Sequence, residues 1–414
     1  MSENIEGDDV SLWVASTPAT DYPALIDDDT VYDLAVVGGG ITGIVTAYEA
    51  LARGLSVVII EKDRLVEWTT GGTTAKLASQ HYLIYDYLIG RHGRNAARAF
   101  ADANQRGVDR VEQIGRSLGI DSEFARRDAY VYSRRGDTVD RMKAEVEAAA
   151  SLGLPATFET TIDLPFDITG AVKFSGQAQF HPRKFLLPLA ADVAARGGVI
   201  YEHTEATDIL PGDPDVVVTR TTSGTGTGRI RARHVLQASG EPFWHREVFD
   251  GFLWLKMSYA LAVRLKPGAA YPHSMYITTD DPMRTMRSAT FEGAPVLIFG
   301  GESHEYDEAT FDEAARHRAL IDDVRRTFDV DRVLFRWLAG DYMPYDRMPY
   351  IGALPGYPTI HVVTGYRAWG LAWAMSAAQA IADDVTGTPV DWAAPFRLDR
   401  LAHPIPPAER VSGF

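Results

Sequence analysis

Residues 31–61 read VYDLAVVGGGITGIVTAYEALARGLSVVIIE, and this stretch decides the fold. An apolar run fills residues 31–37, glycines follow it, a helical pattern extends to about Arg53, and residues 56–60 form a second β-rich run. Strand, glycine-rich turn, helix and strand in this order predict a βαβ unit.

The glycines between the first strand and the helix match the fingerprint of dinucleotide-binding proteins. Gly38 permits the tight turn, Gly40 lets the backbone approach a pyrophosphate, and Gly43 allows the helix to pack on the strand. The amino terminus of the helix, with Ile41 and Thr42, then faces the phosphates. Because the motif lies between a strand and a helix, we expect all five residues to bind a dinucleotide.

Glu61 ends the second strand, 18 residues after Gly43, where a carboxylate accepts both hydroxyls of an adenosine ribose. A carboxylate at this place disfavours a 2′-phosphate, so NADP is not expected. FAD and NAD share this half of a site, and the choice between them rests on other segments.

Two further segments favour FAD over NAD. Residues 69–80 (TTGGTTAKLASQ) are small, polar and glycine-rich directly after the second strand, where a flavoprotein threads its backbone along the cofactor. Residues 362–372 (VVTGYRAWGLA) lead into the last helix, whose amino terminus stabilises negative charge on the flavin pyrimidine ring. An NAD enzyme has no need for the second motif. The cofactor contacts expected from these segments are Gly72, Gly365, Trp369, Gly370 and Leu371.

Composition and charge restrict the remaining functions. The 414 residues exceed what one hydrophobic core usually holds, and 46% hydrophobic with 23% charged residues is typical of globular proteins. A net charge of −15 repels nucleic acid and anionic membranes, and the apolar stretch 31–52 holds Asp33, Glu49 and four glycines, so it is a poor membrane span. The chain has no cysteine, which excludes disulfides, thiolate catalysis and iron–sulfur ligands, so redox chemistry must come from a cofactor. We expect no metal site, and the polar, acidic amino terminus predicts a cytoplasmic protein.

Five stretches carry a resemblance that covers nearly the whole chain: residues 11–25 (SLWVASTPATDYPAL), 72–86 (GTTAKLASQHYLIYD), 100–111 (FADANQRGVDRV), 176–190 (GQAQFHPRKFLLPLA) and 341–352 (DYMPYDRMPYIG). They resemble the FAD-dependent oxidoreductases of the D-amino-acid oxidase, glycine oxidase and sarcosine oxidase superfamily, and above all a bacterial branch that usually carries a carboxy-terminal Rieske iron–sulfur domain. Without cysteine this chain cannot hold a Rieske cluster, so we expect no such domain and another route for the electrons.

The resemblance implies an α/β fold with two domains: a Rossmann-like FAD domain interleaved with a substrate domain that is built on a large antiparallel sheet. Substrate would lie between that sheet and the flavin ring. The βα elements at both ends and in the middle of the chain agree with interleaving. The expected division is an amino-terminal arm wrapped over the surface at 1–30, an FAD domain at 31–92, 172–245 and 338–400, and a substrate domain at 93–171 and 246–337.

By the same resemblance, several further residues would contact the cofactor. Lys62, Thr73, Thr74 and Leu77 would line it, Ala206 would contact the adenine side, and Ala238 would pass near the pyrophosphate. Dimethylglycine-type relatives attach flavin covalently to a histidine, and Thr73 and Thr74 occupy that position here. We therefore expect dissociable, non-covalent FAD.

Relatives remove a hydride from a carbon bonded to nitrogen, which gives an imine and reduced flavin. Lys76 is similar in position to residues beside the flavin ring, where its ammonium would polarise N5 or attract superoxide; the alternative is a surface lysine. His81 follows the flavin loop and is either a base or a structural histidine. Tyr259, in MSYALAVRL, has an even chance of facing the flavin or the opposite layer.

The substrate and the electron acceptor are less well defined. Met343 replaces the arginine that clamps the substrate carboxylate in amino-acid-oxidising relatives, and Arg347 is either its substitute or a surface residue. The missing clamp favours an amine or a larger, less charged substrate over simple α-amino acids. Ile298 and Phe299 replace the oxygen-activating lysine of sarcosine-oxidase-like proteins, so the acceptor is oxygen or an unknown molecule. The alternatives are a flavoenzyme that tailors a biosynthetic intermediate by cyclisation, desaturation or hydroxylation, an NAD dehydrogenase, and a non-catalytic flavin-stabilised scaffold.

Overall fold

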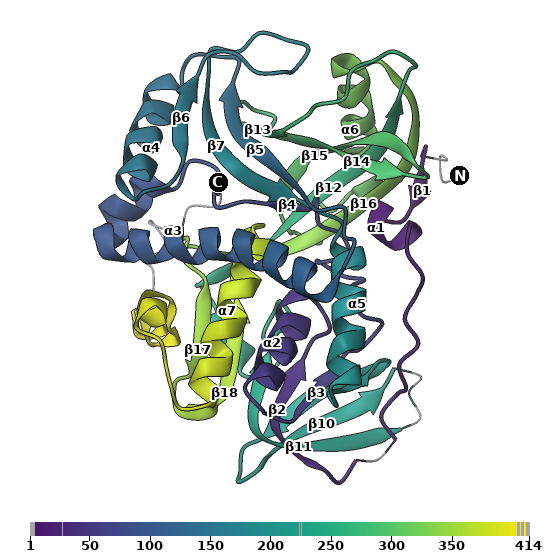
Figure 1. Cartoon of the computed structure of the whole chain (residues 1–414), viewed down its shortest axis with the longest axis vertical. Coiled ribbons are helices and arrows are strands. Elements are labelled where there is room, and N and C mark those ends of the chain that lie inside the picture. Colours follow the sequence, from purple (N-terminus) through teal and green to yellow (C-terminus); the bar gives the residue numbers. More distant parts are fainter. Residues whose placement is uncertain are drawn as a thin grey trace.

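The computed structural model describes residues 5–26, 28–222, 224, 226–403, 406 and 410. Two β-sheets form two layers, the smaller in the lower half of Figure 1 and the larger in the upper half. Helix α3 (Tyr85–Leu118) runs across the molecule between the two halves. The predicted α/β architecture with a nucleotide-type layer and a large sheet is confirmed.

The smaller sheet is the dinucleotide-type layer that residues 31–61 predict. Its spatial order is β17 (Tyr350–Leu354), β18 (Tyr357–Thr364), β11 (Thr227–Gln237), β2 (Val31–Val37), β3 (Val57–Ile60) and β8 (Val199–Tyr201), and β10 (Asp215–Thr221) pairs with β11 and with β9 (Thr204–Leu210). From β18 to β8 the neighbouring strands run parallel. Strands of this kind are buried on both faces, which explains their continuous apolar runs.

Alternate residues of β2 supply the two faces of this sheet. Leu34 faces helices α2 (Ile41–Ala52), α5 (Pro182–Ala195) and α7 (Gly370–Val385), which lie on one side of the sheet in Figure 1. Ala35 faces the opposite side, which packs against the strands β9 to β11. The helix layer therefore brings the amino termini of α2 and α7 to the same end of the sheet, below the larger sheet.

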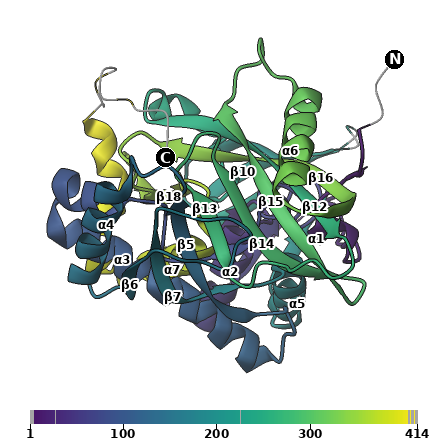
Figure 2. The ribbon, with the colours of Figure 1, turned by 90° about the horizontal axis from the view of Figure 1, so that it is seen from above.

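The larger sheet contains ten strands among the described residues. Its order is β1 (Asp8–Asp9), β16 (Val330–Pro344), β12 (Leu253–Leu265), β15 (Ala294–Glu305), β14 (Arg284–Phe291), β13 (Met275–Thr278), β5 (Ala125–Ser133), β7 (Gly170–Gln179) and β4 (Lys76–Leu77), with β6 (Ala156–Glu159) beside β7. The long strands lie side by side in Figure 2 and are mostly antiparallel. Helix α6 (Glu313–Thr327) packs on the outer face, and the inner face packs toward the smaller sheet.

Helix α3 is longer than its sequence pattern predicts. The apolar periodicity indicates a helix from Ala96, whereas the helix begins at Tyr85 and is kinked at Gly93, which has a φ of 80°. The kink breaks the periodicity of the first turns. Helix α4 (Val139–Ser151) packs on β6 and β7. Short 3-10 segments occupy Arg246–Phe249, Asp391–Phe396 and Leu398–Ala402.

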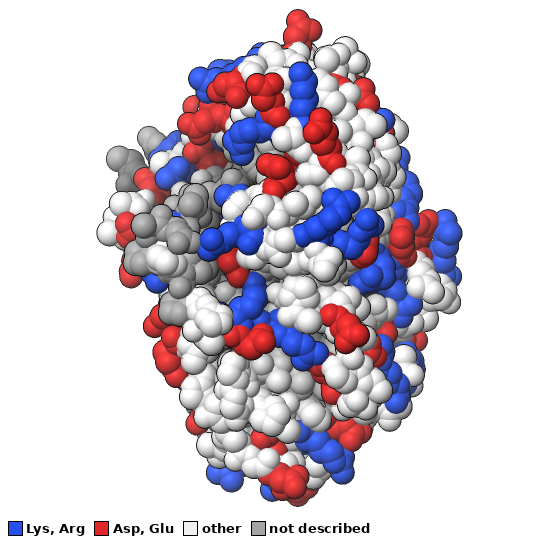
Figure 3. All heavy atoms as spheres, turned by 90° about the vertical axis from the view of Figure 1, so that its left-hand side faces the viewer, with Lys and Arg blue, Asp and Glu red and all other residues white. Residues whose placement is uncertain are grey.

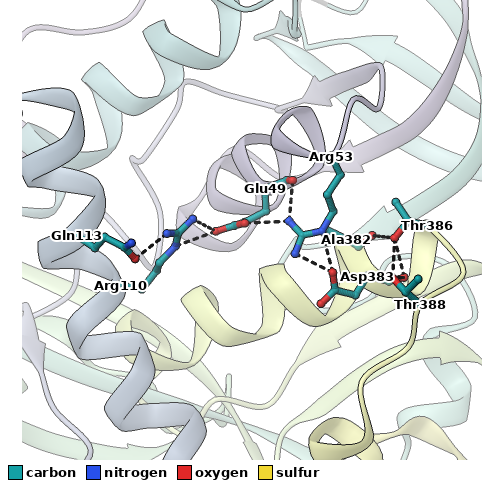
Figure 4. A network of polar contacts seen from close by, with 8 residues as sticks. All are labelled: Glu49, Arg53, Arg110, Gln113, Ala382, Asp383, Thr386 and Thr388. Carbon is teal, nitrogen blue, oxygen red and sulfur yellow. Dashed lines mark hydrogen bonds and ion pairs between the residues drawn. The ribbon is translucent and has the colours of Figure 1, made fainter.

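A buried carboxylate ties three helices together (Figure 4). Glu49 of α2 is 3% exposed and accepts hydrogen bonds from Arg110 Nη2 of α3 at 2.6 Å and from Arg53 Nη1 at 2.9 Å. Arg53 also donates to Asp383 of α7 at 2.8 Å. The network fixes the helix between the two sheets onto the helix layer of the smaller one.

The predicted surface arm is wrong for residues 8–15, whereas residues 16–26 and 28–30 contain no helix or strand and are mostly partly buried or exposed. Strand β1 joins the edge of the larger sheet through β16, and helix α1 (Leu12–Ala15) follows it. Leu12 and Trp13 are buried in the main core, because each is apolar and α1 enters the space between the sheets. Residues 1–4 and 27 lie outside the described residues.

The sheets also divide the chain at other places than predicted. Residues 172–179 of β7 and 338–344 of β16 pair within the larger sheet, although both ranges fall in the predicted FAD segments. In the part of the chain that the structure describes, no helix has the length and apolarity of a membrane span, and no cluster of metal-ligating side chains is found. Acidic and basic side chains are interspersed over the face in Figure 3.

Candidate functional site

Close backbone contacts surround the glycine fingerprint. A Cβ on Gly43 would lie 1.9 Å from the carbonyl oxygen of Gly38, and one on Gly38 would lie 2.5 Å from that of Ala238. Gly38 also has a φ of 117°, which favours glycine. Helix α2 therefore packs against the end of β2 as the fingerprint requires, and Ala238 lies beside the turn.

The amino terminus of α2 opens onto this turn. Its N-cap residue is Gly40, which has no capping side chain, and the N–H of Ile41 donates to Oγ1 of Thr70 at 3.2 Å. An acceptor oxygen at this position occupies the place where helix termini bind phosphate oxygens. Sequence reasoning missed Thr70, although it lies within the 69–80 segment.

Glu61 lies where the ribose of a dinucleotide is expected. It is 7% exposed and accepts hydrogen bonds from the backbone N–H groups of Gly39 at 2.6 Å and Asp63 at 3.0 Å. Burial raises the pKa of Glu61. A carboxylate has about four acceptor sites, so capacity for hydroxyl groups remains. The side chain of Lys62 is exposed over the ring of Trp68, and Ala206 lies in β9.

Three buried donors hold three successive carbonyl groups of the 69–80 segment, which we call the flavin loop. Trp337 Nε1 of β16 donates to the carbonyl oxygen of Gly72 at 2.8 Å, and Trp13 Nε1 of α1 donates to that of Thr73 at 2.6 Å. The third donor is Arg287 Nε of β14, which reaches the carbonyl oxygen of Thr74 at 2.6 Å. The loop is thus fixed by β16 and β14 of the larger sheet and by the amino-terminal helix. No local sequence pattern pointed to these three donors.

Lys76 and Leu77, in the second half of the flavin loop, form β4. Leu77 is fully buried, and Lys76 is partly buried with its Nζ 2.9 Å from Oγ1 of Thr74. Burial, and then the nearby Arg287 guanidinium, lower the pKa of Lys76 to about 7. Lys76 is therefore not the surface lysine of the alternative interpretation.

The second flavin segment meets the fingerprint helix. The hydroxyl groups of Tyr366 and Thr42 lie 3.2 Å apart, and Gly365 turns the chain with a φ of 78°. Helix α7 then begins at Gly370 without a side-chain cap, with Leu371 buried in its first turn. Trp369, just before it, has a buried Nε1 with no hydrogen-bond partner in the protein. A helix terminus and an orphaned donor at one place fit a bound acceptor.

His81 packs among aromatic rings. Its imidazole stacks on Trp369 with ring centroids 5.0 Å apart and lies edge-on to Phe100 at 5.1 Å. Burial, and then the charge of Arg367, lower the pKa of His81, so the ring is neutral. Its Nε2 lies 3.2 Å from the carbonyl oxygen of Ala78. This setting supports the structural interpretation more than that of a base.

Tyr259 lies on the face of the larger sheet that points away from the flavin loop. Its hydroxyl lies 3.2 Å from Nε2 of His304, and its ring packs edge-on against His317 of α6. The strand alternation places Ala260 on the opposite face, beside the main core. The prediction that Tyr259 contacts substrate is wrong in its placement, because alternation alone could not tell the two faces apart.

Arg347 and Arg367 lie close enough for their positive charges to act on each other. Arg347 is partly buried, has a φ of 64° and lies 4.3 Å from the ring centre of Tyr87 of α3. Arg367 is 4% exposed, and burial, and then Arg347, lower its pKa to about 9. Arg347 is therefore no isolated surface residue, and Arg367 was missed by sequence reasoning, although it lies in the second flavin segment.

The geometry fits FAD at each point that can be tested. The fingerprint turn excludes side chains, Glu61 offers acceptors for a ribose, and both flavin segments reach the amino terminus of α2, through Thr70 and Tyr366. Threonines, not a histidine, occupy residues 73 and 74. This fold and site define a flavoprotein oxidoreductase with FAD as its cofactor.

Comparisons with known proteins agree with this class. The family model described as FAD dependent oxidoreductase matches residues 33–384. The Bacillus subtilis (strain 168) protein YhfW, named as a Rieske 2Fe-2S iron–sulfur protein, is 33% identical over 90% of this chain and 72% of its own length. Gamma-glutamylputrescine oxidoreductase of Escherichia coli (strain K12) is 21% identical over 87% of this chain and 85% of its own. The chain belongs to the family of FAD-dependent oxidoreductases.

Solved structures show the same fold. Glycine oxidase from Geobacillus kaustophilus superposes with a TM-score of 0.74 over 90% of this chain and 99% of its own, at 19% identity. L-amino acid deaminase from Proteus vulgaris gives a TM-score of 0.73 over 93% of this chain and 100% of its own, at 17% identity.

Proposed function

We propose that this chain removes a hydride from the carbon bonded to nitrogen in an amine or amino-acid-like substrate and gives an imine. The observation that supports the proposal is that both flavin segments reach the amino terminus of α2, through Thr70 and Tyr366, while Trp337 of the larger sheet holds Gly72 of the flavin loop. FAD supplies the hydride acceptor. The residues of the chain bind the substrate, orient its C–H bond and exclude water.

The names of similar proteins support an amine or an amino acid as the substrate. One is a gamma-glutamylputrescine oxidoreductase, and two of the structural neighbours are a glycine oxidase and an L-amino acid deaminase.

The charges of the site narrow the proposed substrate. Met343 offers no clamp for an α-carboxylate, whereas Arg347 lies toward α3 against Tyr87, with Arg367 close to it. We propose a primary or secondary amine that holds any carboxylate at a distance from the reacting carbon. Comparable turnover on glycine, sarcosine and D-alanine would contradict this.

The first test is an absorbance spectrum followed by anaerobic mixing with a panel of amines and amino acids. We expect flavin absorbance that bleaches with amines, and equal amounts of imine and peroxide if oxygen is the acceptor. Protein that stays colourless with added FAD would overturn the proposal. Product carrying an oxygen atom from O₂ would instead indicate a tailoring enzyme.

A matched pair of glycine variants tests the cofactor separately. Gly43→Ala places a methyl group 1.9 Å from a carbonyl oxygen, so we expect the protein to be purified without flavin. Gly90→Ala is the control, because a Cβ there meets nothing within 4 Å, and it should retain flavin. Equal flavin content in both would contradict the assigned cradle.

A further inference from the structure

Lys256 and Asp341 lie opposite each other on neighbouring strands of the larger sheet. The register of β12 and β16 pairs them directly, and directly paired residues have Cβ atoms about 5 Å apart. Lys256 is 4% exposed, and Asp341 is partly buried. Neither residue contributes to the cofactor contacts described above.

The pair lies on the face that is turned to the flavin loop. Trp337 and Ala339 have the same strand parity as Asp341. Trp337 donates to the carbonyl oxygen of Gly72, and a Cβ on Gly72 would lie 3.1 Å from Cβ of Ala339. Oγ1 of Thr69 also donates to the carbonyl oxygen of residue 340 at 2.9 Å. Asp341 therefore follows directly on the residues that hold the flavin loop.

The second flavin segment bounds the pair on its other side. A Cβ on Gly365 would lie 3.3 Å from Pro344 and 3.4 Å from Leu253, which are the ends of the same two strands. Arg367 is an electrostatic neighbour of Lys256. Lys256 and Asp341 thus lie between the two segments that line the flavin, where the substrate is expected.

The charges that face Lys256 come from three elements. Asp341 of β16 and Arg367 of the second flavin segment act on it, and Glu305 of β15 is its other cross-strand partner and is exposed. Burial lowers the pKa of Lys256 to about 7, although Asp341 opposes this, and burial raises the pKa of Asp341. The lowered pKa makes the ammonium of Lys256 easier to deprotonate than that of an exposed lysine.

We propose that Lys256 and Asp341 form the site that receives the substrate ammonium group and removes its proton before hydride transfer. The inference rests on the proposed function. Hydride loss needs the nitrogen lone pair, and an alkylammonium has a pKa of about 10. Asp341 attracts the ammonium, and Nζ of Lys256 takes one proton as an N–H bond of the substrate breaks. Bound FAD would supply the hydride acceptor. The nitrogen lone pair that Lys256 sets free would form the C=N bond as the C–H bond breaks, and the product would be an iminium.

The site predicts the substrate class more narrowly. A primary or secondary amine carries a proton that Lys256 can remove, whereas a quaternary ammonium has none. We therefore expect N-trimethylated analogues to bind without reducing the flavin.

The test compares flavin reduction by an excess of amine from pH 6 to 10 in the FAD-loaded wild type, in Lys256→Met and in Lys266→Met. Lys266 follows the same strand and is exposed, so its variant should match the wild type. For Lys256→Met we expect a loss of at least 100-fold at pH 7 that recovers to within about 10-fold at pH 10, where the free amine supplies its own lone pair. A Lys256→Met profile equal to that of the wild type would overturn the proposal.

A second readout needs no turnover. The absorbance of oxidised flavin, titrated with pH, should show a transition near pH 7 in the wild type that disappears in Lys256→Met. In Asp341→Asn the transition should move to lower pH, because the carboxylate raises the pKa of Lys256. A wild type that no amine reduces, but which keeps this transition, would refute the proposed function and not the titrating pair. A transition that Lys256→Met and Asp341→Asn both leave unchanged would refute the pair.

Discussion

Two groups of buried charges in this molecule are built in different ways. Around Glu49, one carboxylate is paired with Arg53 and Arg110, and Arg53 is paired in turn with Asp383 (Figure 4). Around the flavin loop, the hydrogen bonds of Arg287 go to neutral carbonyl oxygens, and that of Lys76 goes to a hydroxyl.

The difference indicates that the Glu49 network serves the stability of the fold, whereas the cations around the flavin loop serve cofactor binding. Opposite charges that share hydrogen bonds cancel, so the Glu49 network holds helices together in any ligand state. The charge of a cation that rests on neutral oxygens is not cancelled where water is excluded, which costs free energy and lowers the pKa of Lys76 and Arg287. An anionic dinucleotide offsets that cost when it binds, and its binding then stabilises the fold.

Among the changes that test this difference, Arg287→Leu should have the largest effect. The change leaves the carbonyl groups of Thr74, Ser288 and Phe180 without their donor and frees the flavin loop. We expect the Kd for FAD, measured by quenching of flavin fluorescence, to rise at least 10-fold, about 1.4 kcal/mol. Arg332→Leu, an exposed change on the same sheet, is the control and should leave the Kd unchanged. Equal Kd values for the two variants would show that Arg287 does not contribute to FAD binding.

Glu49→Gln should lower the stability of the fold and leave FAD binding nearly unchanged. Loss of the buried negative charge leaves Arg53 and Arg110 facing each other, and we expect the free energy of unfolding in urea to fall by about 2 kcal/mol. The Kd for FAD should stay within about 2-fold. Glu205→Gln removes an exposed pair with Arg220 and should cost less than about 1 kcal/mol. Loss of FAD binding in Glu49→Gln at unchanged stability would show that the network serves the cofactor.

The pH dependence of the apoprotein gives a smaller effect. In the folded protein the pKa of Lys76 is about 7, below its ordinary value of 10.5, so between these pH values the unfolded chain binds a proton that the folded chain does not. The cost of burying the ammonium is therefore complete below pH 7 and is lost as the pH rises toward 10.5. Relative to Lys76→Met, the wild-type apoprotein should gain stability from pH 7 to 10 in urea unfolding. A constant difference between the two would contradict the lowered pKa.

The nucleotide half of the molecule could be predicted from the sequence because its determinants are local. Each determinant lies within a few residues of the turn or helix end on which its role depends. This holds for the fingerprint glycines, Glu61 and the start of α7. The flavin loop was placed for the same reason. Periodicity also indicated α3, although the kink at Gly93 hid its first part.

The substrate half depends on contacts between segments that are far apart in the chain. No local pattern in a single sequence predicts such contacts. Trp13, Trp337 and Arg287 come from three elements far apart in the chain and meet only at the flavin loop. Lys256 and Asp341 meet through strand register, which is fixed by the packing of both faces. A local pattern predicts the alternation of side chains along a strand, but it does not predict which face of the strand points toward the flavin.

Tyr259→Phe should have the smallest effect and tests that choice of face. The hydroxyl lies 3.2 Å from Nε2 of His304, burial raises its pKa to about 12, and its loss should cost about 1 kcal/mol of stability. Because Tyr259 lies on the α6 side, the rate of flavin reduction by an amine should change by less than about 2-fold, whereas Lys256, three residues earlier on the other face, should control it. A 10-fold slower reduction in Tyr259→Phe at unchanged stability would mean that substrate reaches the outer face, and the assignment of the inner face to the flavin would then be wrong.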